Sequence, residues 1–129
     1  MGTVRLSLVA FLAFAVLLAA CSGTTAEGDS GVEGHVWVGP TCPVVQEGVE
    51  CPDSPLQADL EVRDSFGRVV ARARSDVEGA YRIPLAPGEY TLVPLSPSGA
   101  GLPFASPLPV VITAGVWAEL DIYYDSGIR

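Results

Sequence analysis

Proline and glycine interrupt this chain at short intervals, and that spacing limits the secondary structure it can form. The 129 residues include 11 prolines and 14 glycines, and no segment keeps a sustained helical period. The segments between them alternate apolar and polar side chains, as β-strands with one buried face do. We predict seven strands: Val32–Val38, Ala58–Asp64, Arg68–Ser75, Tyr81–Leu85, Glu89–Leu95, Pro109–Ala114 and Trp117–Asp125. Seven short strands separated by turns predict an all-β fold, a two-sheet β-sandwich.

Three of the connections carry tight-turn residues, at positions 65–67, 76–79 and 86–88. They predict three hairpins in a row, a meander in which Tyr81 and Tyr90 lie on paired strands. Asp76 is expected to accept hydrogen bonds from the backbone of its own turn. In the proline-rich loop Ser96–Pro107, Phe104 is expected to fold back onto the core.

The first twenty residues have the layout of a secretory signal. Arg5 is followed by an apolar run from Leu6 to Ala20, broken only by a serine. As a helix this run spans roughly 22 Å, less than the roughly 30 Å hydrocarbon core of a bilayer. We therefore predict that residues 1–20 are a signal peptide and not a membrane span.

The run ends in the tetrapeptide Leu18-Ala19-Ala20-Cys21, which resembles the lipobox of bacterial lipoproteins. The resemblance implies that Cys21 is lipidated, that residues 21–30 form a polar tether and that residues 31–129 form the domain. An ordinary secreted protein is the alternative. The implied location is the extracytoplasmic side of the cell envelope, and the outer membrane if the cell is Gram-negative, because no aspartate follows Cys21.

Two cysteines, Cys42 and Cys51, remain beside Cys21. In an exported protein such a pair favours a disulfide, and closing this loop stabilises a fold by roughly 2.5–3 kcal/mol. The spacing does not match a Cys-x-x-Cys redox pair, and two cysteines cannot complete a zinc site alone. We predict a stapled surface loop, with a reactive thiol pair as the alternative.

The segment Ser75–Leu95 resembles the signature of carboxypeptidase regulatory-like domains, which are transthyretin-like or prealbumin-like sandwiches of broadly Ig-like shape. The matching positions are Asp76, Gly79, Tyr81, Pro87, Gly88 and Tyr90. The likeness extends over Gly31 to Asp125. It implies a fold and says almost nothing about function, because such modules are accessory parts of many unrelated proteins.

Residues that could carry catalysis are scarce. His35 is the only histidine, which is too few for a catalytic zinc site, and no serine stands in a nucleophile-elbow motif. The Asp76–Gly79 turn lacks the other ligands of a calcium loop. The chain has neither lysine nor asparagine, which excludes a lysine–asparagine crosslink and N-glycosylation. We predict no catalytic residue, metal or cofactor, and hence no enzyme.

Net charge restricts the partners. Without the signal, six arginines oppose fifteen carboxylates, a formal net charge of −9. Such a surface repels nucleic acid, which we therefore do not expect as a partner.

Four side chains on the outward phase of their strands form a candidate binding surface: His35, Trp37, Trp117 and Tyr123. Exposed aromatic rings can anchor a protein partner or stack on sugars. The alternative is that the tryptophans merely cover the sandwich or its proline-rich loop. We expect a monomeric, lipid-anchored structural or interaction module whose partner is an envelope protein. A carbohydrate- or peptidoglycan-binding module is the second hypothesis, and a minor hydrolase or inhibitor dependent on His35 is the least favoured.

Overall fold

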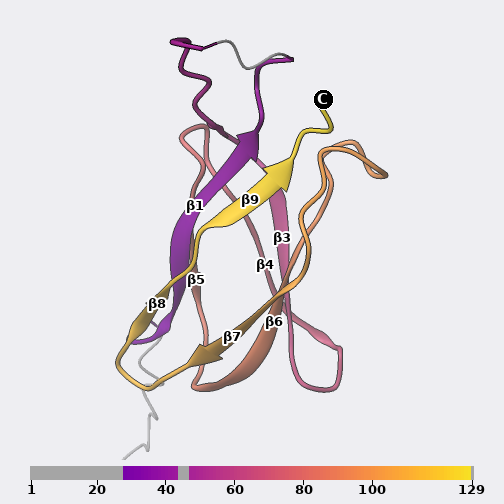
Figure 1. The fold of residues 1–129 in the computed structure, drawn as a ribbon. Helices are drawn as coiled ribbons and strands as arrows, with labels where there is room; N and C mark the ends of the chain where they lie inside the picture. Colours follow the sequence, from indigo (N-terminus) through magenta and orange to yellow (C-terminus); the bar gives the residue numbers. More distant parts are fainter. Residues whose placement is uncertain (1–27, 44–46, 129) are drawn as a thin grey trace, which may run out of the picture.

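The computed structural model describes residues 28–43 and 47–128, which form a sandwich of two β-sheets (Figure 1). Its nine strands are β1 (Gly31–Gly39), β2 (Ser54–Pro55), β3 (Asp59–Arg63), β4 (Val69–Arg74), β5 (Ala80–Pro84), β6 (Gly88–Pro94), β7 (Leu108–Ile112), β8 (Trp117–Glu119) and β9 (Ile122–Asp125). No helix occurs among these described residues. The prediction of an all-β, two-sheet sandwich is therefore confirmed.

The five-stranded sheet is built around β1, which has partners on both sides along its length. On one side β5 and β2 pair with it antiparallel. On the other side β8 and then β9 pair with it in parallel. The first strand of the domain is thus held by its last two strands and lies in the middle of the sheet.

The second sheet has four antiparallel strands in the order β4-β3-β6-β7. Between the two sheets lies one apolar core, to which every strand except β2 contributes a buried apolar side chain or a partly buried one that packs against it. Its most buried large side chains are Tyr124, Leu60, Leu92, Ile122, Val32, Val36 and Val62. Along β1, β3, β5 and β9 the buried apolar side chains alternate with less buried ones, as the alternating sequence predicts for strands with one face turned away from water.

The predicted meander is wrong. Only the 65–67 turn joins strands that pair, β3 and β4. The turns at 76–79 and 86–88 carry the chain from one sheet to the other, so that Tyr81 on β5 and Tyr90 on β6 do not pair. The local chemistry of the Asp76 turn is as predicted, because its Oδ1 accepts hydrogen bonds from the amides of Glu78 and Ala80 at 2.9 Å. A turn of this kind reverses the chain equally well within a sheet or between sheets.

Two further expectations are corrected. The predicted strand Trp117–Asp125 is interrupted between β8 and β9, and the two-residue strand β2 was not foreseen. Phe104 does not fold onto the core, since 54% of it is exposed. Its backbone pairs with that of Asp125 in a two-way bridge of 3.0 and 2.7 Å, which holds the segment at the edge of the sheet.

The loop between β1 and β2 is closed by a disulfide between Cys42 and Cys51, as predicted. Their Cα atoms are 6.0 Å apart, a usual separation for such a bond. Next to it the Thr41 hydroxyl donates a hydrogen bond to the Pro52 carbonyl at 3.0 Å. The staple thus fixes the base of a loop that has no apolar face of its own.

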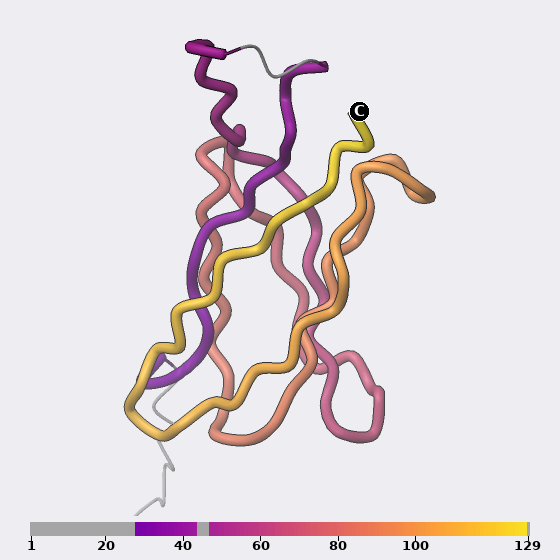
Figure 2. The backbone as a smooth tube through the Cα atoms, viewed as in Figure 1, coloured from indigo at the N-terminus to yellow at the C-terminus, as the bar shows by residue number. Residues whose placement is uncertain are grey.

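The two ends of the sandwich differ in what they carry (Figure 2). The described chain begins at one end, which we call the N-terminal end, beside the loops 64–68, 85–87 and 113–116. The disulfide loop, the 75–79 turn, the proline-rich loop and the C-terminal residues lie at the opposite end. The predicted signal peptide and Cys21 lie outside the described residues. Within those residues no helix is long and apolar enough to cross a membrane.

Candidate binding surface

All four predicted residues lie on the outer face of the five-stranded sheet. Along β1, Val32 and Val36 are fully buried, so Glu33, His35 and Trp37 point away from the core. Tyr123 on β9 is directly opposite Trp37, and Trp117 on β8 is opposite Gly31. Because directly paired residues share a face, these side chains belong to one surface.

Three of the rings form what we call the aromatic row, made of His35, Trp37 and Tyr123. The rings of His35 and Trp37 are stacked, with centroids 5.9 Å apart and planes inclined by 27°. Tyr123 is 61% exposed beside them, and Pro55 of β2 is the partner of Trp37 on the other side. The row therefore extends across β1 and β9, with Pro55 of β2 at its border.

Trp117 is engaged within the molecule, in what we call the Trp117 cluster. The guanidinium of Arg82 lies 3.7 Å from the centroid of its ring. Arg82 is also ion-paired with Glu33 at 3.2 Å. The indole N–H of Trp117 donates to the Gly28 carbonyl at 3.1 Å. Trp117 is therefore held within this chain through both its ring face and its indole N–H, which favours the structural interpretation of this residue.

Gly31 is the reason that Trp117 can reach Arg82. The two side chains come from β8 and β5, which lie on opposite sides of β1, so one of them must cross it. A Cβ on Gly31 would lie 2.6 Å from Cζ3 of Trp117 and 2.2 Å from the Ile83 carbonyl oxygen. The absence of a side chain lets the indole lie across the strand. Trp37 lies six residues beyond Gly31 along β1, which is about 20 Å from it at the usual rise of a strand.

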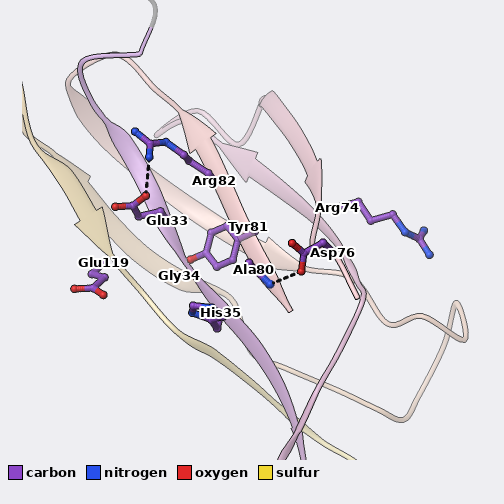
Figure 3. A pocket seen from close by; sticks show the side chains of 9 residues that line it. All are labelled: Glu33, Gly34, His35, Arg74, Asp76, Ala80, Tyr81, Arg82 and Glu119. Atoms are coloured by element: carbon purple, nitrogen blue, oxygen red, sulfur yellow. Dashed lines mark hydrogen bonds and ion pairs between the residues drawn. The ribbon is translucent and has the colours of Figure 1, made fainter. Parts of the chain in front are cut away.

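A hollow of about 510 Å³ opens beside His35, between the aromatic row and the Trp117 cluster (Figure 3). It is lined by Glu33, Gly34, His35, Arg74, Asp76, Ala80, Tyr81, Arg82 and Glu119. Most of its polar groups have partners of their own. Glu33 is paired with Arg82, Asp76 serves its own turn, and the Tyr81 hydroxyl donates to the Leu120 carbonyl.

Two core tyrosines remain protonated at neutral pH. Burial, with a smaller effect of the Asp121 carboxylate, raises the pKa of Tyr81 well above its usual value. Burial, and then Asp59, raises the pKa of Tyr124 to about 12. Their hydroxyls act as hydrogen-bond donors, that of Tyr124 to the Leu95 carbonyl at 2.7 Å. Neither phenol is placed to act as a base.

The arrangement is suited to recognition through contact. Among residues 28–43 and 47–128, no group of three or more histidine, cysteine, aspartate or glutamate side chains could hold a metal ion. The buried serines serve the fold: Ser75 Oγ donates to the Leu56 carbonyl and accepts from the Ala58 amide. What the surface offers is flat aromatic area bordered by carboxylates such as Glu119 and Asp121.

Sequence reasoning missed the residues that organise this surface. In the sequence Arg82 is one polar position within the segment Tyr81–Leu85, and nothing local indicates that it stacks on Trp117. Asp121 lies in the break between β8 and β9, where its Oδ1 accepts the backbone amide of His35 at 2.9 Å. The break would otherwise leave that amide without a strand partner, so the carboxylate replaces a backbone acceptor.

Comparisons with known proteins support the fold and do not identify a family. No family model matches the sequence, and no curated protein matches it. Among solved structures, the chain resembles GBS52, the minor pilin of Streptococcus agalactiae, with a TM-score of 0.54 and 16% identity over 75% of this chain and 44% of that one. It also resembles the group B streptococcus pilus 2b backbone protein, with a TM-score of 0.50 and 15% identity over 77% of this chain and 42% of that one. This chain thus matches less than half the length of either structure, and the likeness is one of fold.

Proposed function

We propose that this chain is a lipid-anchored protein of the cell envelope whose β-sandwich is a non-catalytic structural or protein-interaction module. The observation that carries the proposal is the aromatic row, in which the exposed His35 and Tyr123 flank the half-buried Trp37 on the paired strands β1 and β9. Tryptophan and tyrosine side chains that reach the surface from a rigid support are typical anchors of protein interfaces.

Three features support the location. The sequence begins with a signal-like run that ends in the lipobox-like Cys21. The Cys42–Cys51 disulfide is a bond that persists in oxidising compartments outside the cytoplasm. Two solved structures with a similar fold are pilus proteins, which agrees with an extracellular structural role. We therefore propose an extracytoplasmic, membrane-anchored location, in the outer membrane if the cell has one.

The fold also agrees with assignment to the carboxypeptidase regulatory-like group. Asp76 closes its turn through two amides, and Gly79 has a φ of +80° that suits glycine. The hydroxyls of Tyr81 and Tyr90 each donate to a backbone carbonyl, of Leu120 and Ala86 respectively. In this proposal the signature residues are structural and the function belongs to the outer face.

Crosslinking in intact membranes tests the interaction role. The wild-type chain should recover a specific envelope protein, and Trp37→Ala or Tyr123→Ala should reduce that recovery at least severalfold, since each removes an anchor. Val111→Ala is the matched control, because Val111 is 65% exposed on the outer side of the other sheet. Equal recovery by all variants would refute the assignment of the row.

Membrane anchoring is tested separately. Changing Cys21 to Ala should move the protein from the membrane fraction to the soluble one, because burial of the acyl chains is what holds it. Retention of this variant in the membrane would contradict the anchor.

A glycan is the second candidate ligand, since adjacent rings on one face can stack on sugars. The carboxylates around the row favour an uncharged glycan. Quenching of tryptophan emission by a member of a glycan panel, lost in Trp37→Phe, would support this function. A hydrolase or inhibitor would instead show an activity that depends on His35.

A further inference from the structure

The N-terminal end of the sandwich carries a second candidate surface. The described chain begins there at Gly28, seven residues after Cys21. Fully extended, seven residues span at most about 25 Å. If Cys21 carries lipid, as proposed above, this end of the domain is held next to the bilayer surface and the disulfide loop faces away from it.

The 64–68 turn at this end presents a bare aromatic side chain. Phe66 is 81% exposed, although exposure of an apolar ring to water is unfavourable. Within residues 28–43 and 47–128 the ring lies largely open to solvent, and it contacts the guanidinium of Arg68, 5.1 Å from its centroid. A partner outside the domain would be needed to bury it.

The turn that carries Phe66 is strongly organised. Asp64 Oδ1 accepts the amides of Phe66 and Arg68 at 2.9 and 3.0 Å, and its Oδ2 accepts Arg68 Nε at 3.0 Å. These bonds and the Arg68 charge outweigh the effect of burial and lower the pKa of Asp64. The ring is therefore held out by a pre-formed loop, which lowers the entropic cost of docking it.

The rest of this end is compatible with a lipid surface. Val116, in the neighbouring 113–116 turn, is 50% exposed, and Asp64 is neutralised by Arg68, while Asp29 and Glu89 are other exposed carboxylates at this end. The long Arg68 side chain can keep its charge among headgroups while its stem lies along the Phe66 ring. The loops at the opposite end hold a denser set of carboxylates: Glu47, Glu50, Asp53, Asp76 and Glu78.

We propose that the N-terminal end docks on the bilayer that holds the lipid anchor, with Phe66 inserted into the interfacial layer. Docking is intramolecular once the anchor is in place, so a weak contact is sufficient. Burying most of one phenylalanine favours the docked orientation by about tenfold. Because the domain is acidic, the surface it fits is zwitterionic, and anionic lipid should weaken the contact.

Tryptophan substitutions and brominated lipid test this orientation. The full lipidated chain, with Trp37→Phe and Trp117→Phe, would receive either Phe66→Trp or Val77→Trp and be reconstituted in phosphatidylcholine vesicles with brominated acyl chains. Val77 is the matched control, because it is 79% exposed in a tight turn at the opposite end. We expect strong quenching and a blue shift at position 66, and emission close to that of soluble protein at position 77.

Native Trp117 provides a second readout if the doubly substituted background does not fold. In a Trp37→Phe chain, Trp117 lies at the N-terminal end and should be quenched by the same vesicles. Phe66→Ser should lower that quenching severalfold, and Val77→Ser should not. Thermal melting of each variant before reconstitution checks that it is folded.

Vesicle flotation separates the two proposals. If the wild-type chain does not float with vesicles, or floats equally well as Cys21→Ala, the lipid anchor is refuted. If the wild-type chain floats and Cys21→Ala does not, the anchor stands. Equal quenching at positions 66 and 77, or no quenching at position 66, would then overturn the docking proposal. Protection of position 66 that depends on protein concentration and not on lipid would assign the ring to a second copy, and would also overturn it.

Discussion

Gly79→Ala should destabilise the domain far more than a glycine of identical backbone conformation elsewhere. Gly79 has a φ of +80° and is buried in the turn that crosses from β4 to β5. A Cβ there would lie 2.4 Å from the Val36 carbonyl oxygen, which already accepts the Leu56 amide at 2.9 Å. The carbonyl of Gly79 itself accepts the Val36 amide at 2.8 Å. Relief of the clash must therefore move the central strand or break these bonds.

Gly67 supplies the control. Its φ is +79°, and a Cβ there would meet nothing within 4 Å. Alanine at either site has to accept a left-handed conformation, which costs roughly 1–2 kcal/mol and is partly offset by a less flexible unfolded chain. Gly67→Ala should thus cost about 1 kcal/mol. Gly79→Ala adds overpacking of about 1–3 kcal/mol, for a total of about 2–4 kcal/mol.

Urea and thermal unfolding of the soluble Cys21→Ala domain would measure both changes. For a domain of this size each kcal/mol lowers Tm by roughly 4–8 °C, so the two variants should be well separated. Because the sites are at opposite ends of the sandwich, the double variant should lose the sum of the two within about 0.5 kcal/mol. Equal losses for Gly67→Ala and Gly79→Ala would refute the argument from close approach.

Three other outcomes follow from the structure. Reduction of the Cys42–Cys51 bond should lower the free energy of unfolding by roughly 2.5–3 kcal/mol, and an unchanged Tm after reduction would contradict the staple. The pKa of Tyr124 is about 12 in the folded domain and about 10 in the unfolded chain, so the unfolded chain loses this proton first. The free energy of unfolding should therefore fall as pH rises from about 10 to 12, and this group should not affect it at lower pH. In urea titrations, the free energy of unfolding of Tyr124→Phe should fall less steeply with pH over the same range. An identical dependence on pH in both proteins would refute the assignment. A double-mutant cycle of Arg82→Gln and Trp117→Phe should give a coupling of about 0.5–1 kcal/mol in unfolding experiments, and no coupling would mean that the stacked pair is incidental.

The features that could be predicted from the sequence are those that depend on residues close together in the chain. Alternation placed Val32, Val36, Ile122 and Tyr124 inside, because burial acts on each strand separately. The Asp76 turn and the Cys42–Cys51 bond also depend on residues close together in the chain. In the candidate surface, the outward phase of Trp37 and Tyr123 was predicted for the same reason.

The features that could not be predicted depend on which strands become neighbours. The turn at 76–79 has the same chemistry whether the next strand pairs with β4 or enters the other sheet. Trp117 stacks on Arg82 only because β1 lies between β8 and β5 with Gly31 at the crossing point. This arrangement involves three segments that are far apart in the sequence, so no local sequence pattern predicts it.

The parallel pairing of β1 with β9 also determines how the domain would bear force. β1 begins at the N-terminal end and β9 finishes at the opposite end, and four residue pairs from Val36↔Ile122 to Gly39↔Asp125 join them. Tension between a membrane anchor and a partner at the far end would run along both strands, across the direction of their hydrogen bonds. Such a load is shared by all the bonds at once instead of opening them one by one. This pairing would therefore resist extension of the domain between its two ends.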